Sequence, residues 1–154
     1  MPKLAINDVA LYYEIHGDGI PLLLISGLAS DSQSWLPVIG DLAPHCRVIT
    51  VDNRGAGRTS PLAAETSIRA MADDCMALIR RLGLQSVNLL GHSMGGFVAQ
   101  ECAIHYPEHV DTLILAATSS HNSGRNNDLF STWASTLEEG PDLKLWFLSI
   151  FHWI

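Results

Sequence analysis

Apolar residues follow two kinds of pattern along this chain. Residues 21–25 and 48–51 are short, continuously apolar runs, which is typical of parallel strands covered by helices on both faces of a sheet. Residues 4–7 and 10–15 instead flank a turn at residues 8–9, a pattern that predicts an antiparallel hairpin at the edge of a sheet. We therefore expect an edge hairpin followed by two strands from the middle of a sheet.

A helical pattern lies between Thr66 and Gly83, where apolar residues recur at spacings of three and four and so share one helix face. Thr66 or Ser67 can cap its start and Gly83 its end. The apolar residues of this face are Ile68, Met71, Ala72, Cys75, Leu78, Ile79 and Leu82. Because strands alternate with such helices, the predicted fold class is α/β with a mostly parallel, doubly wound sheet.

The segment Gly91-His92-Ser93-Met94-Gly95-Gly96 joins the apolar strand at residues 87–90 to a helical stretch beginning at residues 97–100. A serine between glycines at a strand-to-helix turn is typical of a nucleophile elbow. The glycines are required because larger residues would clash with the neighbouring backbone in so tight a turn. The alternative is that Ser93 merely caps the following helix.

Three segments together resemble the α/β-hydrolase fold family. The first is the elbow, and the second is VDNRGAGRTS at residues 51–60, which is similar to the family's Asp-x-Arg-Gly-x-Gly-x-Ser turn. The third is LLLISGL at residues 22–28, which is similar to the family's strand and oxyanion loop, with Ser26 where histidine is usual. The resemblance extends over residues 3–154 but covers only the first half of the family's fold.

This resemblance implies parts that the 154 residues do not contain. The family carries an acid after its seventh strand and a catalytic histidine after its eighth, whereas residues 113–117 are expected to form the sixth. A single domain of this type commonly needs about 250 residues. We therefore expect a truncated chain, with the N-terminal part of the core at residues 1–118 and the start of a helical lid at residues 119–154.

The resemblance also implies the roles of individual residues. Ser93 would be the nucleophile, and the main-chain N–H groups of Met94 and Leu28 would form the oxyanion hole. His121 follows the sixth strand and is a weaker alternative to the missing base. In the lid, Leu129, Phe130, Trp133 and Leu137 share one helix face. The expected substrate-binding residues are Gly27, Leu28, His121, Trp133 and Trp146.

Other polar residues are expected to have structural roles. His92 adjoins Ser93 but projects in a different direction, so we expect it beneath the elbow. His105 and His109 flank the end of the elbow helix and are expected to make surface hydrogen bonds. Asp52 and Arg54 are expected to shape their turn rather than to react, since the glycines of the motif serve the turn geometry.

Charge and composition exclude several classes. The net charge is −7 and no basic cluster is present, which disfavours a nucleic-acid partner. The chain begins without the apolar core of a signal peptide, so a cytoplasmic location is expected. Three cysteines suggest buried, reduced thiols, and no residue cluster has metal-ligand spacing. The apolar run from Leu143 contains Lys144 and His152, which disfavours a membrane span. No cofactor is expected.

The function implied by the resemblance is hydrolysis of a small carboxylic ester, thioester or lactone through a serine acyl-enzyme. The 154-residue chain alone is expected to be inactive. A cofactor-free haloperoxidase and a non-catalytic ligand-binding or scaffold protein of the same fold are the alternatives. The apolar end at Trp153 and Ile154 predicts association, as a homo-oligomer or with a complementing chain.

Overall fold

The computed structural model describes residues 3–62, 64–121, 123–140 and 142–151. The chain divides into two compact units, Met1–Ser120 and His121–Ile154, whereas the predicted boundary lies after residue 118. The strands of the first unit are β1 (Lys3–Ile6), β2 (Val9–His16), β3 (Ile20–Ile25), β4 (Cys46–Val51), β5 (Val87–His92) and β6 (Val110–Ala116). Its α-helices are α1 (Leu36–Leu42), α2 (Ile68–Arg81) and α3 (Met94–His105), and two 3₁₀ turns cover Ser32–Trp35 and Pro107–His109.

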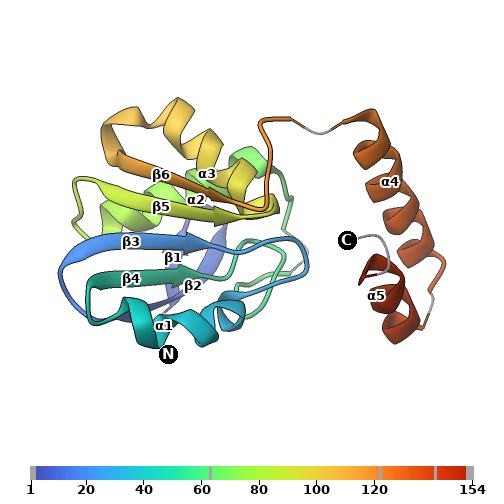
Figure 1. The fold of residues 1–154 in the computed structure, drawn as a ribbon, viewed down its shortest axis with the longest axis horizontal. Coiled ribbons are helices and arrows are strands. Elements are labelled where there is room, and N and C mark those ends of the chain that lie inside the picture. The colour runs from blue at the N-terminus through green and yellow to red at the C-terminus, as the bar shows by residue number, and fades with distance from the viewer. Residues whose placement is uncertain (1–2, 63, 122, 141, 152–154) are drawn as a thin grey trace. The chain divides into compact units, whose positions relative to one another are not determined.

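The strands form one six-stranded sheet in the order β1-β2-β4-β3-β5-β6 (Figure 1). The hairpin β1–β2 is antiparallel and lies at one edge, and β2 also pairs antiparallel with β4. The remaining pairs, β3 with β4, β3 with β5, and β5 with β6, are parallel. The predicted edge hairpin, central strands and α/β class are therefore confirmed.

Helices cover both faces of the sheet. Leu23, Ile49 and Leu89 belong to a buried cluster with residues of α2 and α3, whereas Leu22 and Val48 belong to a second cluster with Ile39 of α1. Alternate residues of a strand point to opposite faces, so α2 and α3 cover one face and α1 the other. This double covering explains why the central strands β3, β4 and β5 are apolar at most positions, with Thr50 and Asn88 among the exceptions.

Helix α2 begins and ends close to the predicted positions. The hydroxyl of Ser67 accepts a hydrogen bond from the N–H of Ala70, and Gly83 follows the helix with a φ of 70°, a conformation that favours glycine. The helix also buries Asp74, which is 1% exposed and which the apolar spacing did not predict. Two of the three cysteines, Cys75 and Cys102, are buried free thiols as expected, but Cys46 is only half-buried.

The second unit contains α4 (Gly124–Glu138) and α5 (Leu143–Phe151). Trp133 contacts Phe130 edge to face, with ring centroids 5.5 Å apart, and its carbonyl accepts a hydrogen bond of 3.0 Å from the indole of Trp146. His152, Trp153 and Ile154 lie outside the described residues. No helix in the described part of the chain has the length and apolar character needed to cross a bilayer.

Candidate active site

Ser93 occupies a sharp turn between β5 and α3. Its φ is 54° and its ψ is −120°, a backbone conformation that costs about 1–3 kcal/mol for a residue other than glycine. The turn is held by hydrogen bonds of 2.9 Å from the Ser93 N–H to the carbonyl of Ala116 and from the Gly96 N–H to the carbonyl of Ser93. Helix α3 begins at Met94, three residues earlier than the expected start at residue 97. The sharp strand-to-helix turn predicted around Ser93 is therefore present.

The neighbouring glycines leave no room for a side chain. A Cβ added to Gly91 would lie 2.3 Å from the carbonyl oxygen of Gly95, and one on Gly95 would lie 2.1 Å from the carbonyl oxygen of Ile25. The hydroxyl of Ser93 makes no hydrogen bond that caps α3, so the alternative role as a helix cap is wrong. The strained serine and the crowded glycines together hold strand β5, helix α3 and strand β3 in close contact.

The loop after β3 brings a second main-chain N–H to this edge of the sheet. Gly27 is buried, and a Cβ placed on it would lie only 3.1 Å from the Cβ of Ser93. The next residue, Leu28, has an exposed side chain. Met94 is the first residue of α3, so its N–H has no acceptor within the helix and lies at the positive end of the helix dipole. Leu28 directly follows Gly27 and Met94 directly follows Ser93. The two residues predicted to supply the oxyanion hole are therefore the chain neighbours of two residues that lie close together.

Side-chain hydrogen bonds hold the loop after β3 at both ends. At its start, the buried Ser26 donates its hydroxyl to the carbonyl of Asp31 at 3.0 Å, and its own carbonyl accepts a bond of 3.2 Å from the amide of Asn53. At its end, the N–H of Ser32 donates to Asp52 at 2.8 Å. Ser26, which replaces the usual histidine, therefore has a structural hydrogen-bonding role.

Asp52 is buried at the end of β4 and stays ionised through its donors. Burial opposes its charge, but hydrogen bonds from Ser32 and from Arg58 outweigh burial and hold the pKa of the Asp52 carboxyl below its usual value. The Arg58 main-chain N–H donates at 2.7 Å and its Nε at 3.3 Å. The carboxylate therefore ties the turn after β4 to the loop after β3.

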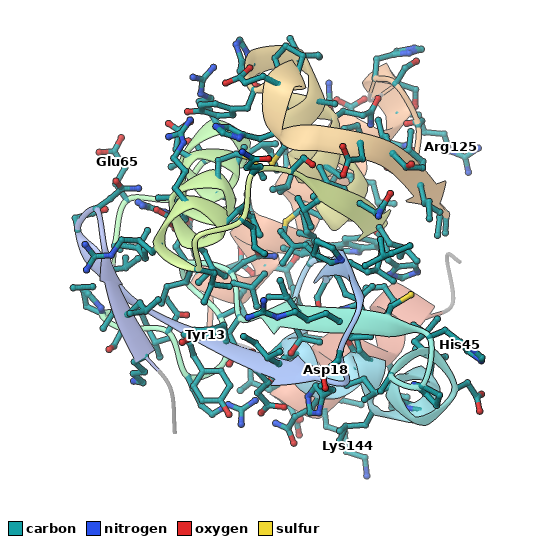
Figure 2. All side chains as sticks on the ribbon, turned by 90° about the vertical axis from the view of Figure 1, so that its left-hand side faces the viewer. Tyr13, Asp18, His45, Glu65, Arg125 and Lys144 are labelled. Atoms are coloured by element: carbon teal, nitrogen blue, oxygen red, sulfur yellow. The ribbon has the colours of Figure 1, made fainter. Side chains whose placement is uncertain are left out.

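Arg54 forms a buried ion pair with Asp74 of helix α2. Its Nε and one terminal nitrogen donate to the two carboxylate oxygens of Asp74 at 2.8 and 2.9 Å, and the side chains are 5% and 2% exposed. It also donates to Asp8 at 2.9 Å and to the carbonyl of Glu65, labelled in Figure 2, at 2.8 Å. Asp52 and Arg54 thus have the structural role expected of them.

The described histidines near the sheet make no hydrogen bond to the Ser93 hydroxyl, although a Cβ added to Gly27 would lie 3.5 Å from Nδ1 of His92 and 3.1 Å from the Cβ of Ser93. His92 is exposed and stands edge to face against Trp35, with ring centroids 6.4 Å apart, so its predicted place beneath the elbow is wrong. His105 pairs with Glu101 at 3.1 Å, and His109 makes a hydrogen bond of 2.6 Å with the carbonyl of Gln85, as expected of surface histidines. Within the described ranges, no side chain is hydrogen-bonded to the Ser93 hydroxyl.

The remaining predicted substrate-binding residues belong to the second unit. His121 is exposed, whereas Trp133 and Trp146 are half-buried and are joined by the indole hydrogen bond given above. Across the part of the chain that the structure describes, no group of three or more His, Cys, Asp or Glu residues could hold a metal ion. The role of Asn53 was not predicted, because an amide one residue after Asp52 carries no local pattern that identifies its partner.

Comparison with known proteins places this arrangement in context. The family model described as alpha/beta hydrolase fold matches residues 20–149. The chain is 34% identical over 134 residues to a putative carbamate hydrolase, RutD, of Agrobacterium fabrum, covering 84% of this chain and 51% of the relative. It is 35% identical over 113 residues to the (E)-2-((N-methylformamido)methylene)succinate hydrolase of Acinetobacter baylyi, covering 73% of this chain and 43% of the relative.

Among solved structures, a thermophilic esterase from Thermogutta terrifontis matches with a TM-score of 0.81 and 30% identity. The match covers 90% of this chain and 53% of the esterase. The chain therefore spans about half the length of the curated relatives and solved structures that it matches.

Proposed function

The chain belongs to the α/β-hydrolase fold family, and we propose that it contributes the nucleophile and the oxyanion donors of a hydrolase acting on small carboxylic esters, thioesters or lactones. The observation that carries the proposal is Ser93 in its strained turn, with a φ of 54°, beside the Gly27 loop. Strain in such a turn is maintained only when the surrounding packing enforces it. Here Gly91 and Gly95 provide that packing.

The reaction follows from these groups. The hydroxyl oxygen of Ser93 attacks the carbonyl carbon of the substrate while a base removes its proton. The negative charge that develops on the carbonyl oxygen is stabilised by the N–H groups of Leu28 and Met94. The leaving alcohol or thiol departs with that proton, and the acyl group remains on Ser93. Water then attacks the acyl-enzyme, releasing the acid and restoring the serine.

The base and its supporting acid are proposed to come from polypeptide outside residues 1–154. Two facts support this: within the described ranges no side chain is hydrogen-bonded to the Ser93 hydroxyl, and the curated relatives are about twice as long. The source would be a longer form of this chain or a complementing chain. Exposed apolar side chains on β6, such as Ile114 at 43% and Leu115 at 44%, are available for such contact.

The relatives widen the range of substrates to test. One relative is named a putative carbamate hydrolase and another an (E)-2-((N-methylformamido)methylene)succinate hydrolase, and one of the matching solved structures is an esterase. Carbamates therefore join esters, thioesters and lactones as candidates. We propose that Gly27 and Leu28 contact the acyl group of the substrate.

The test begins with the protein purified from its natural source using an antibody against residues 1–154. Its intact mass is measured, and it is treated with a fluorophosphonate, which reacts with activated serines. A mass of about 28 kDa, expected for about 250 residues, with labelling mapped to Ser93, is the predicted result. Ser93→Ala expressed in the same length should be unlabelled and should not hydrolyse p-nitrophenyl acetate above background.

A mass of 16.8 kDa without labelling would refute the proposal and favour a non-catalytic ligand-binding or scaffold protein. The observation that favours this second candidate is the absence, within the described residues, of any side chain bonded to the Ser93 hydroxyl. For the recombinant 154-residue chain alone, we expect hydrolysis near background. A substantial rate that Ser93→Ala abolishes would show that no further polypeptide is needed. Peroxide-dependent halogenation by the untreated natural protein would identify a haloperoxidase instead.

A further inference from the structure

We propose that Asn53 is a positioning residue that fixes the distance between the two oxyanion donors, Leu28 and Met94. The proposal rests on the proposed function of those N–H groups. Asn53 is 3% exposed and lies two residues after β4, outside the elbow and the oxyanion loop. Its amide reaches across to the neighbouring strand and donates to the carbonyl of Ser26 at 3.2 Å.

The Ser26 carbonyl is placed where it can transmit this constraint. It lies two residues before Leu28 and packs against the first turn of α3, since a Cβ added to Gly95 would lie 2.7 Å from the Ser26 oxygen. Gly95 in turn directly follows Met94. The carbonyl that Asn53 holds therefore lies between the loop that carries one donor and the helix that carries the other.

The remaining bonds of the loop leave this point dependent on Asn53. The Ser30 N–H donates to the carbonyl of Gly27 at 3.3 Å, which closes the turn around Leu28 but connects it to nothing outside the loop. The Ser26 hydroxyl bonds to the carbonyl of Asp31 within the loop and, at 3.3 Å, to the hydroxyl of Ser34 in the 3₁₀ turn that directly follows it, so neither bond reaches another strand. Asp52 holds the far end through the Ser32 N–H. The Asn53 amide is thus the side-chain hydrogen bond that anchors the near end to another strand.

The side chain of Asn53 uses only its donor. Its Oδ1 atom is buried and has no hydrogen-bond partner among the described residues, although buried polar atoms are usually paired. Replacing the amide by the similarly sized side chain in Asn53→Leu therefore removes one bond to Ser26 and removes an unpaired buried oxygen. The variant isolates the anchoring bond better than a truncation would.

The chain offers a control bond at the other end of strand β3, made by a half-buried asparagine. Asn88 of β5 donates its amide to the carbonyl of Pro21 at 3.2 Å, the same type and length of bond at the opposite end of β3. Asn88→Leu removes that bond without touching the loop at residues 26–32. A general weakening of the sheet would appear in both variants, whereas loss of positioning would appear only in Asn53→Leu.

Hydrogen–deuterium exchange of the 154-residue chain tests the anchoring directly. In Asn53→Leu the amides of residues 26–32 should exchange about tenfold faster than in the unaltered chain, because local opening becomes easier. In Asn88→Leu they should exchange at the unaltered rate. Equal exchange of this loop in Asn53→Leu and in the unaltered chain would overturn the proposal. Should Asn53→Leu fail to fold, Asn53→Ala is measured in its place.

Fluorophosphonate labelling of Ser93 in the natural-length protein tests the consequence for chemistry. Labelling of Asn53→Leu should be at least about tenfold slower than for the unaltered protein, since small displacements of reacting groups cost such factors. Asn88→Leu should be unaffected, and with substrate the loss should fall on kcat rather than on KM. An unlabelled parent would refute the proposed function while the exchange result still decides whether Asn53 anchors the loop. Faster loop exchange with unchanged labelling would refute the positioning role alone.

Discussion

The buried ion pair between Arg54 and Asp74 provides a stringent test of how the turn after β4 is built. Both side chains are almost fully buried, and two hydrogen bonds of 2.8 and 2.9 Å join them. Asp74 also accepts a bond of 2.7 Å from the amide of Asn7. The hydrogen bonds to Asp74 raise the pKa of the Arg54 guanidinium, so Arg54 remains charged at any pH of the assay.

Removing one partner leaves the other charge buried and uncompensated. Truncation of one member of a buried pair typically costs about 3–5 kcal/mol, against a total stability of about 5–15 kcal/mol for a domain. Asp74→Leu should therefore lose about a fifth or more of the free energy of unfolding. The bond from Arg54 to Asp8 does little to reduce this loss, because Asp8 is 62% exposed and exposed ion pairs are worth about 0–1 kcal/mol.

The assay is urea denaturation of the 154-residue chain followed by circular dichroism. Asp74→Leu, Arg54→Met and the double variant complete a thermodynamic cycle. The double variant removes both charges and leaves neither unpaired. Its loss of unfolding free energy should therefore be smaller than the sum of the two single losses by about 2 kcal/mol or more. Additivity within about 0.5 kcal/mol would show that the two residues do not act as a pair. Single variants that cost under about 1 kcal/mol would refute the reasoning about burial.

Three further predictions concern the elbow, the acid limb of stability and the thiols. Gly95→Ala would place a Cβ 2.1 Å from a main-chain oxygen. It should therefore reduce the free energy of unfolding by about 1–3 kcal/mol, which a lower urea midpoint would reveal. Gly124→Ala meets nothing within 4 Å and is the control; equal effects would contradict the packing argument. Burial raises the pKa of the Asp52 carboxyl, but its hydrogen bonds outweigh burial and hold that pKa below the ordinary value of 3.8. The ionised carboxylate therefore stabilises the fold above pH 3.8, and this stabilisation is lost as the pH falls through the lowered pKa. The fall in Tm between about pH 5 and pH 2 should be shallower in Asp52→Asn, and parallel curves would argue against it. Cys46 is half-buried, whereas a hydrogen bond to the Cys102 thiol and burial raise the pKa of the Cys75 thiol. Cys46 should therefore react with Ellman's reagent before Cys75 does. Faster reaction of Cys75 would contradict this order.

The parts of the fold that sequence predicted are those that depend on local backbone requirements. Continuous apolar runs predicted the central strands, because a strand covered on both faces is apolar at nearly every position. The glycines around Ser93 predicted the sharp turn, because a Cβ on Gly91 or Gly95 would overlap main-chain oxygens. These requirements are set by a few neighbouring residues, and they can be recognised without knowledge of distant contacts.

Distant partners account for what sequence did not predict. Asp74 lies on a helix whose apolar spacing was correct, yet its burial depends on Arg54, twenty positions earlier. His92 was placed beneath the elbow, but β5 continues through it to its last residue and leaves the ring exposed against Trp35. The roles of Ser93, Leu28 and Met94 stay predictions, because their chemistry requires a base that no described contact supplies.

The turn after β4 contains three consecutive residues, Asp52, Asn53 and Arg54, whose side chains bond to three different parts of the structure. Asp52 accepts a hydrogen bond from Ser32 at the far end of the loop after β3, Asn53 donates one to Ser26 at its near end, and Arg54 pairs with Asp74 on α2. Their substitution should therefore have separable effects. Changes at Arg54 should lower stability without changing the reactivity of Ser93 in molecules that remain folded, whereas changes at Asn53 should lower reactivity more than stability. Changes at Asp52 should affect both, because its carboxylate is buried and also holds the loop. A motif of adjacent residues can thus couple stability and catalytic geometry through contacts that run in opposite directions from one turn.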